Sequence, residues 1–384
     1  MATIEDPSSL TWRDHWVYQL DGKGGRSARR AQYRFLPQHE GRSVIAWGLA
    51  QMDNGEIAVA GVAGAIRSDS ESDQTVVAFS ADQGATWSEY VAVAGCSSRP
   101  MMLAYLGGGV LSFMSSWEQS GNYRWYSHDY GRTWSEKAKL PPAPDGKAVD
   151  CEGNSLLERD KNGTVVMMAE TGATESKGPI FEKPICGCIR WSRDGGRTWE
   201  NFSWPEAWQW QDTFEGERHE RGVCEGGLVR AANGWIVAAL RMDPPIRFAR
   251  LHYDNFMGTA VSISKDDGKS WSDLNVVFGP GRQHANLLRS PNGDLVMTVI
   301  RRLDLRQGEL ASYRRGCDAV VSRDNGLSWD VDRMYILDDF AAIGSKWWYE
   351  VKCGHLFSIG LDDGRVLTTF GYYDNAAALV LWRP

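Results

Sequence analysis

Long hydrophobic runs and blocks of like charge are both missing from this sequence. No stretch of about 18 apolar residues occurs, so we expect no membrane-spanning helix and no membrane partner. The 42 basic residues stand against 49 acidic ones, a formal net charge of -7, and no basic stripe predicts a nucleic-acid partner. The N-terminal segment has no basic region followed by an apolar one. This predicts a cytoplasmic protein, or a secreted one given without its leader.

Cysteine is scarce. The seven cysteines are an odd number in a chain long enough to build a core without disulfides, so we expect mostly reduced, buried thiols. Cys186 and Cys188 form a C-x-C pair with no second pair at zinc-site spacing. We therefore expect no metal, and no cofactor. Glycine and tryptophan are abundant instead, at 41 and 18 residues. This mixture indicates many short strands, tight turns and aromatic surfaces of the kind that stack on sugar rings.

One eight-residue motif, S-x-D-x-G-x-[ST]-W, occurs five times. Its copies begin at Ser80, Ser127, Ser192, Ser264 and Ser322. In such a segment the aspartate and the hydroxyl residues bond the backbone of a tight turn, the glycine takes a positive φ, and the tryptophan packs the turn onto a sheet. Because the polar atoms are used locally, we predict a structural role for all five copies.

A second repeat consists of a turn glycine that follows one apolar stretch and precedes another. The turn glycines are Gly55, Gly108, Gly163, Gly234, Gly293 and Gly364. Each unit therefore opens with a β-hairpin, and the six units predict an all-β, six-bladed β-propeller. The last unit has no S-x-D motif of its own, so we expect the N-terminal segment to supply its outer strand. Residues 1–384 would then be a single domain.

Propeller geometry brings particular residues to one rim of the ring. The innermost strand of each blade begins on one face and the second strand returns to it, whereas the S-x-D turns fall on the opposite face. Counting about nine residues back from the turn glycines, or about seven forward, leads to this rim. The polar residues found there are Arg99, Glu152, Glu225, His284, His355, Arg241, Arg301 and Tyr372. Charged and imidazole groups at positions where a core strand should be apolar predict a functional site.

These residues also have structural interpretations. Glu152 beside a guanidinium can form a buried ion pair that has no role in chemistry. His284 and His355 can be hydrogen-bonded core histidines or ligands of a cation, but their equal register in adjacent units favours a functional role. Arg301 and Arg302 can belong to a solvated loop.

The S-x-D-x-G-x-[ST]-W turns resemble the Asp-boxes of the sialidase (neuraminidase) superfamily, whose members are six-bladed propellers. The resemblance covers essentially the whole chain. Asp-box propellers also include lyases, non-catalytic receptors and carbohydrate-binding proteins, so the motif is more specific for the fold than for the function. In sialidases an arginine triad binds the sugar carboxylate, a tyrosine activated by a glutamate is the nucleophile, and an aspartate on a first-blade loop is the acid/base.

The resemblance implies roles for residues of this chain one by one. Residues 64–73, which precede a strand and the first Asp-box, look like the first-blade loop. Asp69 or Asp73 would then be the acid/base, and Arg67 on the same segment would bind substrate.

Further along the chain, Glu225 and Arg241 are similar to the sialidase glutamate and second arginine, and Arg301 is the nearest match for the third. The sequence departs from the family at two positions. No arginine occurs at residues 45–47, where the first triad member is expected, and His355 stands where the nucleophilic tyrosine is expected.

Three functions follow from this combination. The leading one is an exo-acting glycoside hydrolase that removes a terminal acidic sugar with paired carboxylates in the acid and base roles. The second is a lyase, in which an arginine neutralises the carboxylate of a uronic acid and a histidine or tyrosine removes the adjacent proton. The third is a glycan-binding propeller without catalysis. All three predict an acidic oligosaccharide or glycan as the partner.

The candidate residues fall into two groups. The candidate catalytic residues are His355, Glu225, Asp69, Asp73 and His284. The candidate substrate-binding residues are Arg241, Arg99, Arg301, Glu152, Arg67 and Tyr372.

Overall fold

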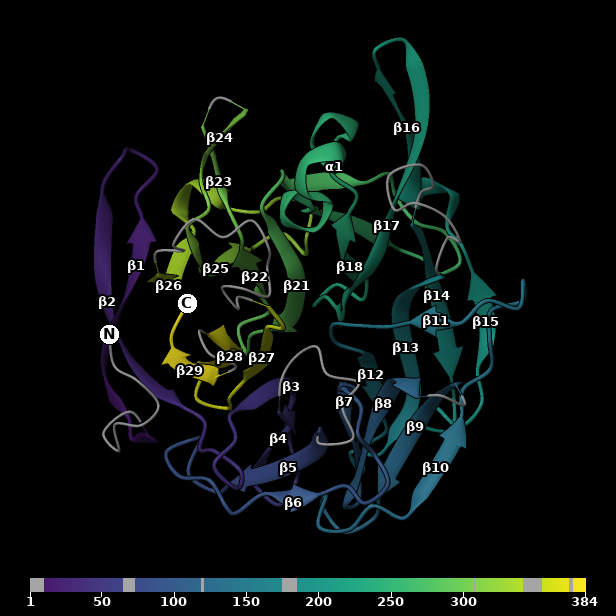
Figure 1. Ribbon diagram of the computed structural model, residues 1–384, viewed down its shortest axis with the longest axis vertical. Helices are drawn as coiled ribbons and strands as arrows, with labels where there is room; N and C mark the ends of the chain where they lie inside the picture. The colour runs from purple at the N-terminus through teal and green to yellow at the C-terminus, as the bar shows by residue number, and fades with distance from the viewer. Residues whose placement is uncertain are drawn as a thin grey trace.

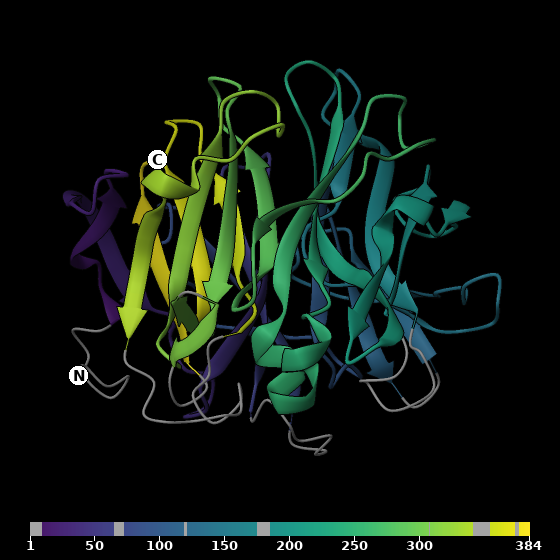
Figure 2. The ribbon, with the colours of Figure 1, turned by 90° about the horizontal axis from the view of Figure 1, so that it is seen from above.

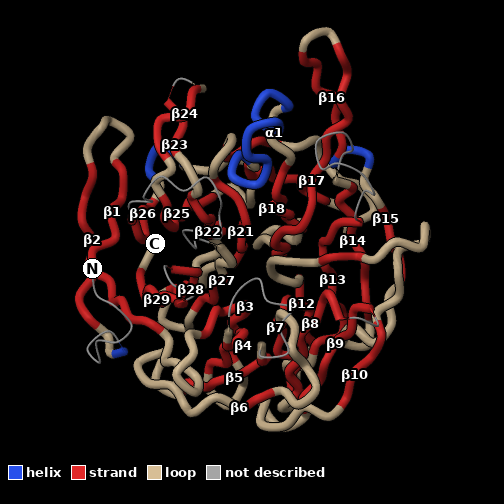
Figure 3. Tube along the Cα trace, viewed as in Figure 1, coloured by secondary structure: helices blue, strands red, loops and turns tan. Residues whose placement is uncertain are grey.

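Antiparallel strands form nearly all of the regular structure. The computed structural model describes residues 10–64, 73–118, 121–174, 185–306, 308–340, 354–372 and 376–384. Its sheets stand around a central axis as the blades of a β-propeller (Figure 1), and the strands run between the two faces of the ring (Figure 2). The helical segments of the described residues are α1 (Ile246–His252) and the 3-10 turns Glu206–Trp208, Tyr253–Phe256 and Val331–Arg333. Figure 3 shows how little of the trace they occupy. The predicted all-β class is confirmed.

The first three sheets follow one another along the chain. The first contains β3 (Val44–Gln51), β4 (Ile57–Ala63), β5 (Gln74–Ser80) and β6 (Val91–Ala92). The second contains β7 (Pro100–Gly107), β8 (Val110–Glu118), β9 (Gly121–Ser127) and β10 (Glu136–Lys139). The third contains β11 (Val149–Asp150), β12 (Leu156–Arg159), β13 (Val165–Thr174), β14 (Cys186–Ser192) and β15 (Glu200–Ser203).

The remaining strands include those that close the ring. The fourth sheet contains β16 (Gln209–Phe214), β17 (Glu217–Arg230), β18 (Ile236–Met242), β19 (Gly258–Ser264) and β20 (Asn275–Phe278). One nine-stranded sheet joins β21 (Arg282–Arg289), β22 (Leu295–Arg301), β25 (Arg315–Ser322), β26 (Tyr335–Phe340), β1 (Arg13–Leu20), β2 (Arg26–Phe35), β29 (Ala376–Trp382), β28 (Val366–Tyr372) and β27 (Phe357–Gly360). A separate hairpin pairs β23 (Asp304–Arg306) with β24 (Glu309–Ser312).

The N-terminal strand β2 pairs with the C-terminal strand β29. Gln32 lies opposite Leu381, and Phe35 lies opposite Ala378. Strand β1 continues the sheet through a short ladder to β26, in which Tyr18 faces Ile336. The strands expected to form the last two blades are therefore one continuous sheet. The number of blades stays a prediction, as does the single-domain organisation.

The five Asp-boxes form the turns that their sequence predicts. In the third copy Ser192 Oγ donates to Asp194 Oδ1 at 2.8 Å, and Gly196 N donates to Ser192 Oγ at 2.7 Å. Thr198 N and Thr198 Oγ1 donate to the two oxygens of the same carboxylate at 2.9 and 2.6 Å. Equivalent serine–aspartate bonds recur in the other four copies. The turns follow β5, β9, β14, β19 and β25, at the end of the blade opposite to the start of the innermost strand.

Asp194→Asn tests this structural role. The amide nitrogen cannot accept the bond from Thr198 Oγ1, so we expect the free energy of unfolding to fall by about 1–3 kcal/mol. Any activity of the folded protein should not change, because the turn lies at the far end of the blade from the site described below. Urea unfolding and kcat measured on the same preparation check this. A loss of kcat at an unchanged unfolding free energy would place the Asp-boxes at the site.

Apolar side chains fill the spaces between neighbouring sheets. One cluster joins Trp47, Met101 and Met114 of the first two sheets to Leu367 and Leu379 near the chain's end. Of the six cysteines in the described residues, all but Cys186 are buried, as predicted. None of the helices in the described ranges is long and apolar enough to cross a membrane.

Candidate functional site

The innermost strands begin with irregular backbone, and this irregularity aims side chains at the rim. Register shifts occur in β3 between Ala46 and Gly48 and in β21 between Gln283 and Asn286. His284, within the shift of β21, has a φ of 52°, and His355, just before β27, has a φ of 55°. A positive φ is costly for a histidine and is kept where the surroundings fix it, often at functional sites. β-Bulges re-aim side chains next to active sites in the same way.

Two Cys-Glu-Gly triplets meet near the propeller axis. Gly153 has a φ of 128°, and a Cβ added there would lie 2.4 Å from the carbonyl oxygen of Gly226. Only glycine allows this approach between the third and fourth sheets. Thr171 Oγ1 donates to the same Gly226 oxygen at 2.7 Å and fixes the contact. The position of Glu152, one residue before Gly153, is thus set by a close backbone contact between two blades.

Glu152 lies between two imidazoles. Its Oε1 is 2.9 Å from His284 Nδ1 and 3.0 Å from His355 Nδ1. The two imidazole rings are 6.0 Å apart and inclined by 66°. Both histidines are buried, with exposed fractions of 8% and 4%. Glu152 lies between β11 and β12 of the third sheet, whereas His284 and His355 lie at the two ends of the nine-stranded sheet, in β21 and just before β27, so closure of the ring assembles the group.

Two guanidinium groups bind the other nitrogen of His284. Arg241 Nη1 lies 2.9 Å and Arg302 Nη2 3.1 Å from His284 Nε2. Because guanidinium groups only donate, Nε2 accepts and the proton of this imidazole is on Nδ1, facing Glu152. Asp254 pairs with both arginines, with Arg241 at 3.8 Å. The 3-10 turn that follows α1 supplies Asp254, so the segment between β18 and β19 holds the two guanidiniums in place.

His355 stacks on an aromatic ring. The centroids of the His355 and Trp47 rings are 3.6 Å apart, with 32° between the planes. The guanidinium of Arg99 lies 5.1 Å from the same indole. When the Nδ1–H group of His355 donates a hydrogen bond to Glu152, the lone pair of the imidazole is on Nε2. Nε2 is then the atom that can accept a proton.

The pKa values of Glu152 and His355 shift in the directions that a carboxylate–imidazole pair requires. Burial opposes ionisation of Glu152, but the facing imidazoles of His284 and His355 outweigh it and hold the pKa of this carboxyl well below its usual range. Burial, together with the nearby His284 and Arg99, lowers the pKa of His355 from 6.5 to about 4 although Glu152 opposes the shift. At neutral pH the pair is therefore a carboxylate and a neutral imidazole that can act as a base.

This shift predicts the acid limb of the pH profile. If His355 is the base, kcat/KM should stay level from neutral pH downward and fall only as the pH approaches about 4, since the neutral imidazole persists to that point. The free energy of unfolding should also decrease as the pH falls from 6.5 to about 4. The pKa of His355 is 6.5 in the unfolded chain and about 4 in the folded one, so between these two pH values the unfolded state binds more protons than the folded state. An acid limb near pH 6.5 would show that a different group titrates.

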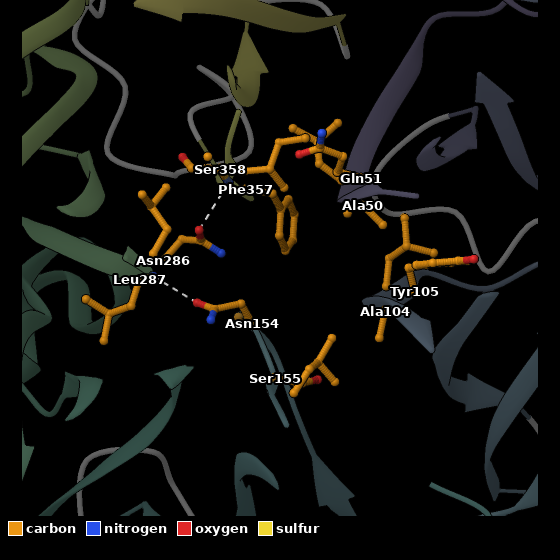
Figure 4. Close-up of a pocket in the computed structure, with 18 of the residues that line it drawn as sticks. Ala50, Gln51, Ala104, Tyr105, Asn154, Ser155, Asn286, Leu287, Phe357 and Ser358 are labelled. Atoms are coloured by element: carbon orange, nitrogen blue, oxygen red, sulfur yellow. Dashed lines mark hydrogen bonds between the residues drawn. The ribbon is translucent and has the colours of Figure 1, made fainter. Parts of the chain in front are cut away.

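Two cavities lie along the axis. The smaller, of about 10 Å³, is lined by Glu152, His284 and Phe357 among others and has room for about one water molecule. The larger, of about 270 Å³, is formed by the innermost strands of several sheets (Figure 4). Asn154 Oδ1 accepts from Leu287 N at 2.8 Å, and Asn286 Oδ1 accepts from Ser358 N at 3.1 Å. Asn154 thus joins the third sheet to the nine-stranded sheet, and Asn286 joins β21 and β27, the two end strands of that nine-stranded sheet.

Several of the predicted site residues meet in this cluster. Those in contact through polar atoms or ring stacking are Glu152, His284, His355, Arg241 and, through Trp47, Arg99. Asp73 is buried at the start of β5, where a Cβ on Gly64 would lie 2.2 Å from its Oδ1. Its role as the acid stays a prediction.

Other predicted residues are placed elsewhere. Arg301 bonds to Asp339 at 2.8 Å and lies 3.7 Å from Asp318, while its neighbour Arg302 takes the position on His284. Tyr372, at the end of β28, packs its ring 5.2 Å from that of Phe35. The interpretation of Arg301 and Arg302 as a solvated loop is wrong, because both side chains are buried.

Three predicted residues fall outside what the structure describes. Arg67 and Asp69 belong to the undescribed segment 65–72. Glu225 lies in β17, but its side chain is not among the described ones.

Trp47, Arg302 and Asp254 are members of the cluster that the register count missed. Trp47 occupies the position at which the resemblance to sialidases predicts an arginine. A tryptophan at that position could itself have been recognised as a candidate site residue. The count reached Arg301, whereas the irregular backbone beyond β22 presents Arg302. Nothing in the sequence singles out Asp254, because the turn that carries it has no motif.

The cluster is arranged for proton transfer and anion binding. Within the described ranges, no three His, Cys, Asp or Glu side chains are placed to hold a metal ion. The Nδ1 atoms of both imidazoles lie within 3.0 Å of the same carboxylate oxygen, and two guanidinium groups contact the Nε2 of His284. Fixed guanidiniums beside a carboxylate–imidazole pair can bind a carboxylate and move a proton next to it.

Comparison with known proteins agrees with this architecture. Residues 98–339 match a protein family described as "BNR repeat-like domain". No curated protein matches the sequence.

Three solved structures show the same fold. A protein of unknown function from Dyadobacter fermentans is 16% identical, with a TM-score of 0.61 over 92% of this chain and 99% of that one. The NanB sialidase from Streptococcus pneumoniae is 13% identical, with a TM-score of 0.57 over 91% and 70%. An α-L-arabinanase from Penicillium chrysogenum is 11% identical, with a TM-score of 0.55 over 97% and 98%. The chain therefore has a propeller fold that glycoside hydrolases also use.

Proposed function

The chain belongs to the family of BNR repeat-like domains, and on this premise we propose that it is an exo-acting glycoside hydrolase that removes a terminal acidic sugar. One observation carries the proposal. The buried pair of Glu152 and His355 lies at the same rim as a group of arginines, on a fold that a sialidase and an arabinanase share. The acidic sugar and the exo action are inferred from that charge and from the resemblance to sialidases.

Arginines supply the anion-binding part. Arg241 and Arg302 are already oriented by Asp254 and His284, so binding a carboxylate costs them little further side-chain ordering. Arg99 adds a third positive charge beside Trp47. A guanidinium binds a carboxylate with two parallel hydrogen bonds, which fixes the sugar's orientation as well as its position.

His355 is the base in this proposal. Its Nε2 takes a proton from a water molecule, the hydroxide oxygen bonds to the anomeric carbon, and the bond from that carbon to the leaving oxygen breaks. An acid on the opposite side of the sugar ring protonates the leaving oxygen. Of the two aspartates predicted for this role, Asp73 is the one that the structure describes. Glu152 keeps the proton of His355 on Nδ1 and stabilises the imidazolium that forms.

A lyase is the second candidate, favoured by the same imidazole. An arginine that neutralises a uronic acid carboxylate acidifies the carbon next to it, and His355 Nε2 would take that proton while the oxygen at the β position leaves with the electron pair. No water is consumed, and the product carries a new carbon–carbon double bond.

A panel assay separates these functions. The protein is incubated with sialosides and with uronic-acid oligosaccharides while reducing sugar and ultraviolet absorbance are followed together. Hydrolysis raises reducing sugar alone, and elimination raises both signals. Binding without either signal, measured by calorimetry, would leave a glycan-binding propeller and refute the enzymatic proposals.

A further inference from the structure

The N-terminal hairpin forms a ribbon that extends from the ring. Strands β1 and β2 pair over eight residues each, from Arg13 opposite Tyr33 to Leu20 opposite Arg26. Only short parts of the ribbon join the rest of the sheet, through β26 and β29. Figure 1 shows the hairpin at the outer edge of the ring, away from the axis. It therefore has a surface that the candidate site does not use.

The two faces of this ribbon differ. Side chains alternate between the faces, and directly opposed residues share one. One face carries the buried residues Val17, Ala31 and Tyr33 and packs on the propeller. His15 Nε2, on this inner face, lies 2.7 Å from the oxygen of Leu337.

The opposite, outward face carries Trp16, Tyr18, Arg26 and Arg30. Trp16 is 52% exposed, and it is the one aromatic among the large apolar side chains that the described residues expose. The guanidinium of Arg26 lies 4.3 Å from the centre of the Tyr18 ring. Arg30 pairs with Asp14 at 3.0 Å, with both side chains largely exposed. An exposed indole beside a tyrosine and two arginines contributes nothing to the packing of the core.

The ribbon is also basic in an acidic protein. Residues 13–35 contain six lysines and arginines and two aspartates, against a formal net charge of -7 for the whole chain. Opposite charge attracts and orients an anionic partner, and the aromatic rings offer flat apolar surfaces. Trp16 and Tyr18 are two residues apart on one strand, which places them about 7 Å from each other along it. Successive sugar rings of one chain can stack on a pair spaced in this way.

We propose that the outward face of the β1–β2 ribbon is a second glycan-binding site, which takes a linear polysaccharide of uronic acid. Trp16 and Tyr18 stack on its sugar rings, and Arg26 and Arg30 bind its carboxylates. This proposal rests on the proposed function in one respect only, namely that acidic glycans are ligands of the protein. A polymer bound on the ribbon would raise the local concentration of chain ends near the candidate site without changing that site.

Affinity electrophoresis in gels with polygalacturonate tests the site. The protein carries Glu152→Gln, so that the polymer stays intact if the protein is an enzyme. We expect Trp16→Ala to weaken retention by about tenfold, the loss of one good aromatic anchor. Arg26→Ala with Arg30→Ala should weaken it by about fivefold and reduce its dependence on salt, because two charge contacts are gone. Trp16→Phe should keep most of the retention.

Matched controls lie elsewhere on the surface. Leu327 is also 52% exposed, and Leu327→Ala should leave retention unchanged. Arg193, paired with Glu200 at 2.8 Å and similarly exposed, is the control for Arg30. Equal retention of Trp16→Ala and Leu327→Ala would overturn the proposal. Equal retention by a neutral dextran gel, or a dimer in sedimentation that Trp16→Ala abolishes, would also overturn it, the latter in favour of a second copy as the partner.

The outcome is separate from that of the proposed function. If no glycoside is cleaved and retention still depends on Trp16, the ribbon site stands and the enzymatic function fails. If small acidic glycosides are cleaved and retention does not depend on Trp16, the ribbon site fails and the function stands.

Discussion

Glu152→Gln should lower kcat by about 10³- to 10⁴-fold, the size of effect seen when a carboxylate that orients a catalytic imidazole becomes an amide. The amide can donate where the carboxylate only accepts, so it no longer favours the Nδ1 proton on both His284 and His355. The proton then moves to Nε2 of His355, the atom that must be free to accept one. Steady-state kinetics on the substrate found in the panel measures the loss.

The control is a second glutamate of the same sheet. Glu158 pairs with Arg230 at the opposite end of β12, and Glu158→Gln should keep kcat. His355→Ala should cost about 10²- to 10⁴-fold, and the double variant should lose little more than the worse single one, because the two residues act as a unit. Additive losses, or near-normal turnover of folded Glu152→Gln, would remove this pair from the mechanism.

Removal of residues 1–35 should abolish soluble, folded protein. The deletion takes away β2 and leaves β29 as an open edge, with its backbone groups unpaired and its apolar side chains exposed. A single substitution gives a graded test. Phe35 is buried between β29 and the neighbouring rings, and Phe35→Ala should lower the free energy of unfolding by about 3–5 kcal/mol.

Gln32 offers the control on the same strand. It pairs with Leu381 in the same ladder but is exposed, so Gln32→Ala should change the unfolding free energy by no more than about 0.5 kcal/mol. Gel filtration and chemical unfolding measure both variants. A truncated protein that stays monomeric and unfolds at the same urea concentration would show that the N-terminal strand is dispensable.

The sequence predicted the fold because its signals are local and repeated. The bonds of an Asp-box form within seven residues, so Asp194 and its four counterparts identify the turns without knowledge of the rest of the chain. The hairpin glycines act in the same way. The blade count depends on how distant strands join, and the continuous sheet formed through β1 and β2 is not a local property.

The site was predicted in part, for a related reason. Counting from the turn glycines reached Glu152, His284, His355 and Arg241, because the number of residues from turn glycine to rim is similar in the different units. The count is only approximate, and it gave Arg301 in place of its neighbour Arg302. Asp254 comes from a turn between strands and is near the site only through the tertiary fold.

The pairing of β2 with β29 also sets an order of events during synthesis. The ladder that contains Phe35 and Ala378 joins segments far apart in the sequence, so the nine-stranded sheet cannot be completed until the ribosome has made β29. At about 5–20 residues per second, the N-terminal strand waits tens of seconds without its partner. Its run of arginines, which is unusual for a strand that ends beside a buried core, disfavours pairing with the wrong strand during that wait.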